Sequence, residues 1–339
     1  MNHAIIDPQR ASLNGINTPG ALVCPNKAAG MNLGKFKRMA WVGLMAVILS
    51  GCSVVQSLYN NAPQLVYWWL DDYVDFRQDQ KDWVKIRLND LLVWHRSSQL
   101  PIYLEQVKKL TDLAQGEITP EVGCGLVQTL LDTQNAWLDQ MSPPLSIFLS
   151  SMSQRQVQHL QEAFARKNKD WSKEWLEVSD QDRLAHQADK GIEQAQDLYG
   201  KLSASQKGAL RQLAKESGYD AQKSVGLRHA RQQQTLQTIE QLRQMAKTPG
   251  KGSSLVQPSD APLAEPYAPA AVALVRDGLE KMLQPLDPDL RDYNTQRWNM
   301  NCQSSSRFHA LTTPEQRQHA KLRLKRYAQD FQALLATAP

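Results

Sequence analysis

The chain has 339 residues, and 39 Lys and Arg residues against 34 Asp and Glu residues give a formal net charge of +5. Residues 1–51 hold five bases and one acid, so residues 52–339 are almost neutral. Nucleic-acid-binding proteins carry their excess of basic residues in the folded part, so a nucleic-acid partner is not expected. Hydrophobic residues at 42% and charged residues at 22% exclude wholesale disorder.

Residues 1–51 are predicted to be a signal-peptide region. They contain a basic stretch followed by an uncharged one, namely Lys35, Lys37 and Arg38 and then residues 39–49. Eleven residues span about 16 Å as a helix, which is half of a bilayer core. The uncharged stretch is therefore too short for a transmembrane anchor and fits the apolar part of an export signal. We expect Met31 to be the true start, with a real extension over residues 1–30 as the alternative.

The sequence Leu49-Ser50-Gly51-Cys52 resembles the lipobox of bacterial lipoproteins. In that family the cysteine receives a diacylglycerol and an N-acyl chain and becomes the mature N-terminus. Ser53 in place of Asp resembles the type that is sorted to the outer membrane. The resemblance implies a mature domain over residues 52–339, anchored through Cys52 in the periplasmic face of the outer membrane, with no cofactor apart from the acyl chains. An ordinary signal peptide with a chance cysteine is the alternative.

Export also sets the redox surroundings of the cysteines. Cys24 and Cys52 belong to the leader and the lipid site, so Cys124 and Cys302 remain as an even pair in an oxidising compartment. We expect a disulfide between these two residues. Two unrelated buried thiols are the alternative.

Helical periodicity recurs along residues 52–339, and alternating strand patterns bounded by turns are absent. We therefore predict an all-α fold, a multi-helix bundle of antiparallel helices. Helix breaks are predicted at Leu100-Pro101, at Pro143-Pro144, which would end a helix begun at Thr119-Pro120, and near Ser217-Gly218. Residues 248–269 hold five prolines without periodicity and are predicted to be a flexible loop. Residues 206–247 hold eight bases and three acids and are predicted to form a protruding, solvated helical hairpin. A basic surface that faces anionic lipid head groups or acidic envelope polymers is the alternative.

The segment 59–94 is the most unusual part of the chain, because it holds eight of the 22 aromatic residues that follow residue 51. Asp71, Asp75 and Asp79 are four residues apart and are predicted to share a helix face. An amphipathic core helix is the plain interpretation. A lipid-facing aromatic belt and a docking face for a basic partner are the functional alternatives. We prefer docking, because the acids disfavour anionic lipid. The candidate docking residues are Trp68, Trp69, Asp71, Asp75, Trp94, His95 and Arg96.

Several short motifs resemble an uncharacterised lipoprotein family of Gram-negative proteobacteria. They are Tyr59-Asn60-Asn61-Ala62, Tyr67-Trp68-Trp69-Leu70-Asp71, Tyr73-Val74-Asp75-Phe76, Trp94-His95-Arg96, Leu100-Pro101-x-Tyr103, Thr312-Thr313-Pro314-Glu315-Gln316-Arg317 and Tyr327-Ala328-Gln329-Asp330-Phe331. The resemblance implies a helical lipoprotein and no known activity. For His95, which continues an apolar stripe, a hydrogen-bonded and partly buried histidine is the alternative to a recognition residue.

Three helix starts place Ser or Thr three residues before Gln, at Ser153, Ser203 and Thr313. This spacing predicts capping boxes. It also resembles the LTxxQ signatures of small periplasmic stress chaperones, but only two of the three keep the apolar residue before Ser. We therefore expect capping to be the reason for the pattern.

Sequence motifs for catalysis and metal binding, such as HExxH, CxxC and glycine-rich phosphate loops, do not occur. We expect no catalytic residue and no metal site. The leading hypothesis is a non-enzymatic lipoprotein that touches the lipid bilayer through acylated Cys52 and binds an envelope protein. A periplasmic chaperone-like clamp for unfolded clients and an enzyme with a dispersed site are the alternatives.

Overall fold

The computed structural model describes residues 54–247 and 268–337. The signal-peptide region, Cys52 and residues 248–267 of the predicted loop lie outside the described residues. Chain contacts divide the protein into residues 1–54 and residues 55–339. The second of these units is the helical domain.

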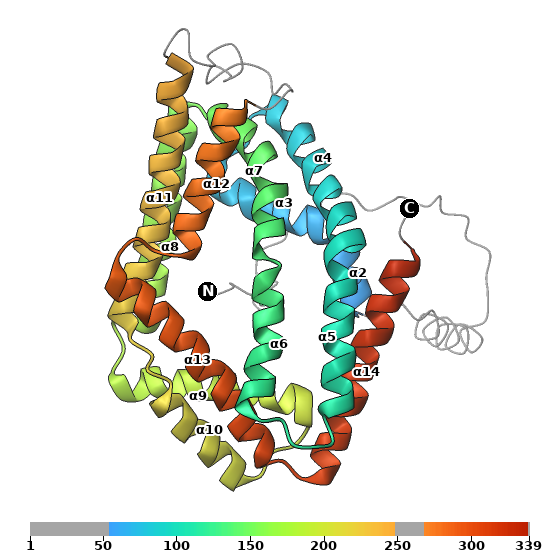
Figure 1. The fold of residues 1–339 in the computed structure, drawn as a ribbon. Coiled ribbons are helices and arrows are strands. Elements are labelled where there is room, and N and C mark those ends of the chain that lie inside the picture. The colour runs from blue at the N-terminus through green and yellow to red at the C-terminus, as the bar shows by residue number, and fades with distance from the viewer. Residues whose placement is uncertain (1–53, 248–267, 338–339) are drawn as a thin grey trace, which may run out of the picture. The chain divides into compact units, whose positions relative to one another are not determined.

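All regular structure in the two described ranges is helical, which confirms the all-α prediction, and no strand occurs there (Figure 1). The helices are α2 (Val54–Asn60), α3 (Ala62–Val74), α4 (Gln78–Trp94), the π-helical η1 (His95–Gln99), α5 (Leu100–Leu113), α6 (Pro120–Asp132), α7 (Gln134–Ser150), α8 (Gln154–Trp175), α9 (Asp180–Tyr199), α10 (Ala204–Glu216), α11 (Ala221–Lys247), α12 (Pro269–Leu283), α13 (Pro288–Ala310) and α14 (Pro314–Ala336). Within the described part of the chain, none of them is both long and apolar enough to cross a bilayer.

The break predicted at Leu100-Pro101 is a widened turn rather than a helix end. Pro101 has no N–H, so a regular α-helical turn at this point would lose a hydrogen bond. The chain instead forms η1, in which the Leu100 N–H donates to the carbonyl of His95. Ser98 Oγ donates to the Trp94 carbonyl at 2.8 Å. The helical run therefore continues from α4 through η1 into α5 (Figure 1).

The prediction that Pro143 and Pro144 end a helix is wrong. α7 runs through both prolines to Ser150, and the interruption lies earlier, at Thr133 between α6 and α7. An interior proline costs about 3 kcal/mol, but the turns after these prolines carry the buried side chains of Ile147 and Phe148. Tertiary packing of those side chains outweighs the local cost of the prolines.

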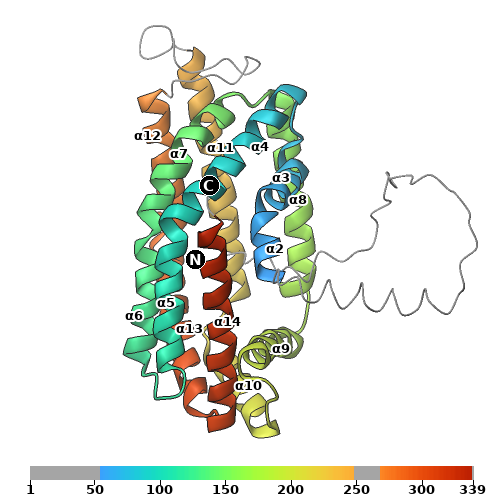
Figure 2. The same cartoon turned by 90° about the vertical axis from the view of Figure 1, so that its right-hand side faces the viewer.

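The helices pack in two places where one pair of consecutive helices meets another pair. We call each pair a hairpin (α3–α4, α7–α8, α9–α10 and α13–α14) and each meeting place a junction. At the first, α3 packs against α8 and α4 against α7; at the second, α9 packs against α14 and α10 against α13. Each junction has its own apolar cluster. The first consists of Tyr67, Val74, Phe76, Val84, Phe148, Met152, Leu160 and Ile239, and the second of Ile192, Ala195, Leu202, Leu213 and Phe308. α5 and α14 lie side by side and connect the two junctions (Figure 2).

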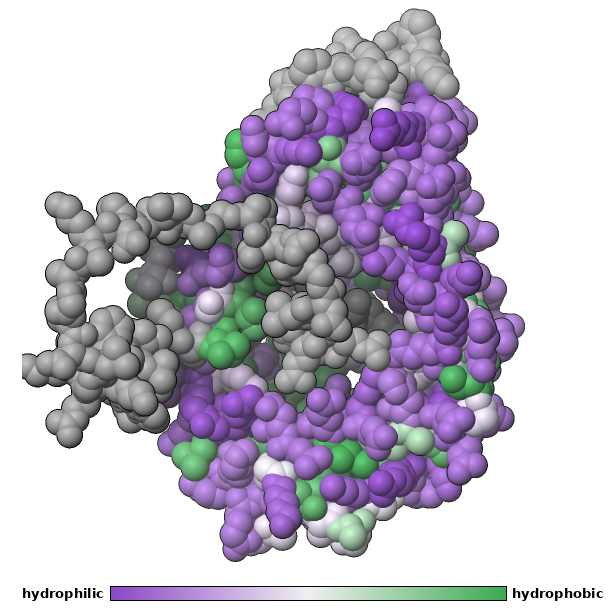
Figure 3. All heavy atoms as spheres, turned by 180° about the vertical axis from the view of Figure 1, so that it is seen from behind, coloured by the Kyte–Doolittle hydropathy of each residue, from purple (hydrophilic) through white to green (hydrophobic). Residues whose placement is uncertain are grey.

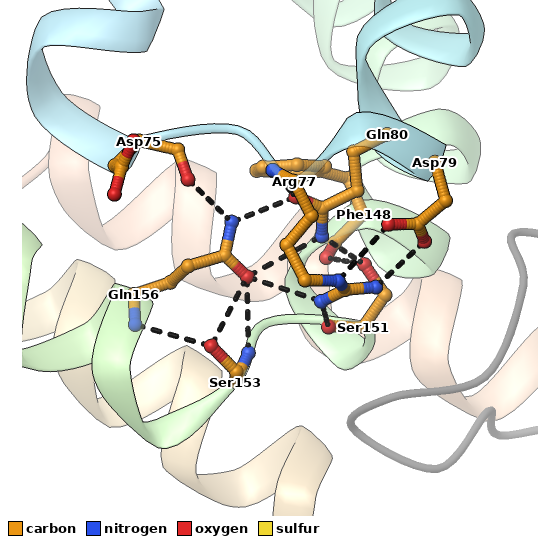
Figure 4. Close-up of polar contacts among 8 residues, drawn as sticks. All are labelled: Asp75, Arg77, Asp79, Gln80, Phe148, Ser151, Ser153 and Gln156. Carbon is orange, nitrogen blue, oxygen red and sulfur yellow. Dashed lines mark hydrogen bonds and ion pairs between the residues drawn. The ribbon is translucent and has the colours of Figure 1, made fainter.

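Gln80 and Gln156 form a hydrogen bond with each other across the first junction (Figure 4). Gln156 Nε2 donates to Gln80 Oε1 at 2.7 Å and to the Asp75 carbonyl at 3.2 Å. Gln156 Oε1 accepts from the Ser153 N–H and from Arg77 Nη1, each at 3.1 Å. Because Gln80 and Gln156 are almost fully buried, these bonds replace the water that both side chains lose on folding.

The second junction repeats this arrangement with Gln206 and Gln316. Gln206 Nε2 donates to Gln316 Oε1 at 2.6 Å, and Gln316 Nε2 donates back to Gln206 Oε1 at 3.0 Å. Gln206 Nε2 also reaches the Leu311 carbonyl, and Gln316 Nε2 reaches the Lys201 carbonyl. The three capping boxes predicted at Ser153, Ser203 and Thr313 are confirmed, and their glutamines additionally join one hairpin to another.

The region between residues 203 and 269 differs partly from its predicted form. The break near Ser217-Gly218 is confirmed, with Gly218 at φ +61° between α10 and α11. The predicted hairpin of these helices is wrong, because α10 packs against α9 and α13 whereas α11 packs against α12 and α7. The predicted loop also extends one residue too far, since α12 begins at Pro269.

Candidate functional site

The short helix α2 is held by three hydrogen bonds to distant parts of the chain. Tyr59 Oη and His95 Nδ1 share one at 2.7 Å, Arg96 Nη2 donates to Asn60 Oδ1 at 2.7 Å, and Gln56 Nε2 donates to Asp330 Oδ1 at 2.9 Å. We call these residues the anchor clamp: Gln56, Tyr59, Asn60, His95, Arg96 and Asp330. A helix of seven residues is not stable alone in water, so the clamp with its packing contacts holds α2 on η1 and α14.

Aromatic rings surround His95 in the clamp. The ring centroids of Tyr59, Tyr103 and Trp137 lie 5.6, 5.4 and 5.3 Å from that of His95. Trp137 Nε1 donates to Tyr103 Oη at 3.3 Å, and the Arg96 guanidinium lies 5.5 Å from the Tyr59 ring centroid. Sequence reasoning did not include Trp137, because it lies on α7 and only the tertiary fold brings it to η1.

Burial among these rings lowers the pKa of His95 to about 4. A buried imidazole loses the hydration that stabilises its charged form, so the neutral form is favoured. His95 is therefore a neutral hydrogen-bonding residue at neutral pH. This agrees with the alternative of a hydrogen-bonded, partly buried histidine.

We expect the clamp to weaken in acid. Unfolded His95 takes up a proton near pH 6.5 and the folded residue only near pH 4, so the unfolded state holds more protons between these values. The stability that neutral His95 contributes is thus complete above pH 6.5 and lost as the pH falls towards 4. The expected loss is about 1–3 kcal/mol at the usual 1.4 kcal/mol per pKa unit.

Urea unfolding at pH 7.5 and pH 4.5 measures this loss. From pH 7.5 to pH 4.5 the free energy of unfolding is expected to fall by about 1–3 kcal/mol more in the natural chain than in His95→Gln. His229→Gln changes an exposed histidine on α11 and is the matched control. Equal pH dependence of the natural chain and His95→Gln would contradict the assignment.

The acidic residues of the segment 59–94 do not form one helix face, so that prediction is wrong. α3 ends at Val74, and Asp75 has a left-handed backbone with φ +54°. The Asp71 carboxylate accepts a hydrogen bond from the Phe76 N–H at 2.8 Å. The other acids of the segment are paired with bases of the same chain, in the ion pairs Asp72–Lys167, Asp75–Arg155, Asp79–Arg77, Asp82–Lys85 and Asp90–Arg87.

The seven candidate docking residues therefore separate into two groups. Asp71, Asp75, Trp94, His95 and Arg96 make hydrogen bonds, ion pairs or ring contacts within the chain. Trp68 and Trp69 keep 60% and 52% of their surface exposed, although the Trp69 ring also contacts Tyr73 with 5.0 Å between the ring centroids. On the face drawn in Figure 3, hydrophobic residues form separate patches on a mostly hydrophilic surface.

Cys124 and Cys302 lie outside the anchor clamp. The structure joins Cys124 on α6 to Cys302 on α13 by a disulfide, with 5.2 Å between the two Cα atoms. Among the residues that are described, no group of three or more His, Cys, Asp or Glu side chains is placed to hold a metal ion.

Residues 72–260 match the sequence profile of a family of unknown function, DUF6279. This is more than half of the chain. The chain belongs to this family. The match includes His95, Arg96 and Tyr103, whereas Tyr59, Asn60 and Asp330 of the clamp lie outside the matched range. No curated protein and no solved structure matches the chain. The expected membership in a family without known activity is thus confirmed, and the lipid anchor stays a prediction.

Proposed function

We propose that this chain is a lipoprotein of the outer membrane whose helical domain acts in the periplasm as a non-enzymatic interaction module for an envelope protein. Acyl chains on Cys52 would hold it, since multiple chains are enough for stable anchoring. The observation that carries the proposal is the anchor clamp. Only Ser53 separates Cys52 from the first residue of α2, and α2 is bonded to η1 and α14.

The clamp would give such a module a defined position relative to its anchor. Lipid attachment by itself restrains only the first residue, and a module on a loose linker would sample many orientations. Here the clamp fastens α2 to helices that run to both hairpin junctions. The domain would therefore present a constant surface to neighbouring envelope proteins.

The alternative of a chaperone-like clamp gains no support from the Ser-x-x-Gln helix starts. The side chains of Gln156, Gln206 and Gln316 bond to residues of the same chain. These amides are thus engaged in capping and in joining hairpins rather than displayed to a client.

Replacing Cys52 tests the anchor. In a Gram-negative host the natural chain is expected to incorporate a labelled fatty acid and to sediment with the outer membrane, whereas Cys52→Ser is expected to do neither. Cys24→Ser removes a leader cysteine and should keep the label. Fatty-acid labelling of Cys52→Ser at the natural level would contradict the assignment.

Crosslinking in intact envelopes tests the interaction module. The natural chain is expected to form a crosslink to the same envelope protein in repeated experiments. The double variant Tyr59→Phe/Asn60→Ala removes two hydrogen bonds of the anchor clamp and is expected to give less of this crosslink. Capture of no specific protein, together with turnover of an envelope substrate by the purified chain, would contradict the proposal.

A further inference from the structure

The chain between the predicted anchor and the acids of α3 is uncharged. No Asp, Glu, Lys, Arg or His occurs in residues 53–70. This stretch spans α2 and most of α3. An uncharged helical stretch of this kind has no charged side chain to desolvate when it approaches an apolar phase.

α3 is apolar on two sides. One side is buried, with Tyr67 and Val74 in the apolar cluster of the first junction. On another side Leu65, Trp68 and Trp69 are exposed, and their spacing of three and four residues places them on one face. Leu58 of α2 is also exposed, at 39%. We call Leu58, Leu65, Trp68 and Trp69 the apolar face.

The acidic residues nearby do not prevent contact with lipid. Asp72 lies 2.8 Å from Lys167, and the hydrogen bond from this lysine lowers the pKa of Asp72. Asp71 accepts the Phe76 N–H, and Asp79 is paired with Arg77. These partners reduce the electrostatic repulsion between the acidic side chains and anionic lipid. That repulsion was the reason to prefer a protein partner from the sequence. The same partners also leave fewer free carboxylates for a basic protein.

The position of the apolar face along the chain points to the bilayer as its occupant. Leu58 follows Cys52 by six residues, and six residues span at most about 22 Å. An acylated Cys52 would therefore keep Leu58 close to the membrane surface. Trp rings favour the boundary between hydrocarbon and head groups, and helices with an apolar side bind in the plane of that boundary.

We propose that α2 and α3 lie along the bilayer that holds Cys52, with Leu58, Leu65, Trp68 and Trp69 inserted at the interface. This inference rests on the lipid anchor proposed above. The clamp and the first junction then fix the orientation of the domain on the membrane. The surfaces of the other helices are left for an envelope protein.

Quenching of Trp fluorescence by brominated lipid tests this proposal. The acylated full chain is reconstituted into vesicles of phosphatidylethanolamine and phosphatidylglycerol, with and without bromine on the acyl chains. The natural chain is expected to be quenched, and Trp68→Tyr/Trp69→Tyr is expected to lose more than about half of that quenching, because every other described Trp is at least partly buried. Ile86→Ser/Val93→Ser changes an exposed apolar pair on α4 and should keep it.

The possible failures can be told apart. A chain that remains outside the vesicles overturns the lipid anchor and this inference together. A vesicle-bound chain whose quenching is the same in the natural form and in Trp68→Tyr/Trp69→Tyr overturns the inference alone. A photoreactive residue at position 68 should crosslink to lipid in intact envelopes, and crosslinking to an envelope protein instead would also overturn it. Thermal melting of each variant shows that it is folded.

Discussion

Replacing Gln156 by Ala is expected to lower the free energy of unfolding by about 2–4 kcal/mol. The amide makes hydrogen bonds to Ser153, Arg77, Gln80 and Asp75. Its removal deprives buried Gln80 of a close partner and leaves a cavity between two hairpins. An unsatisfied buried polar group costs about 1–3 kcal/mol, which accounts for most of the expected loss.

Urea unfolding of Gln156→Ala measures this loss. Gln154→Ala changes an exposed glutamine of the same helix and is expected to stay within about 0.5 kcal/mol of the natural chain. A double-mutant cycle with Gln80→Ala is expected to show coupling of about 1 kcal/mol or more, because the two amides contact each other. Equal stability of Gln156→Ala and Gln154→Ala would contradict the role of this pair.

Removal of the disulfide is expected to have an effect of similar size. Cys124 and Cys302 are separated by 178 residues in the sequence, and their bond joins α6 to α13. The free energy of unfolding of Cys124→Ser/Cys302→Ser is expected to be about 2–5 kcal/mol lower than that of the natural chain, because the crosslink restricts the unfolded chain. Cys302 is buried, so the serine also adds a polar group to a packed position.

Reducing agent provides the control for this variant. It should destabilise the natural chain by a similar amount and leave the double serine variant unchanged. On a non-reducing gel, the faster migration of the natural chain is expected to disappear in Cys124→Ala. Faster migration that survives this substitution would show that the two residues do not pair.

The helix starts could be predicted from the sequence because capping is local. Ser153, Ser203 and Thr313 each accept a hydrogen bond from a backbone N–H three residues later, and the glutamine at that position bonds back. Both partners lie within one turn of the chain. The Ser-x-x-Gln spacing therefore contains the whole interaction, whatever the rest of the fold does.

The candidate site could be predicted only in part. The sequence indicates His95 and Arg96 as candidate residues, but their partners Tyr59, Asn60 and Trp137 come from α2 and α7. The prediction that Asp71, Asp75 and Asp79 share a helix face was wrong because α3 ends at Val74. That helix end depends on a turn that packs into the first junction. Trp68 and Trp69 remained candidates because no other helix in the described residues buries them.

The sequence by itself determined the helical class, the capped helix starts and the uncharged stretch after Cys52, because each depends on residues a few positions apart. Only the tertiary structure decided that α7 continues through Pro143 and Pro144, that the capping glutamines pair across hairpins, and which aromatic side chains stay exposed. These features depend on contacts between segments 70 or more residues apart. Burial and hydrogen bonding across such contacts outweigh local preferences of about 1–3 kcal/mol.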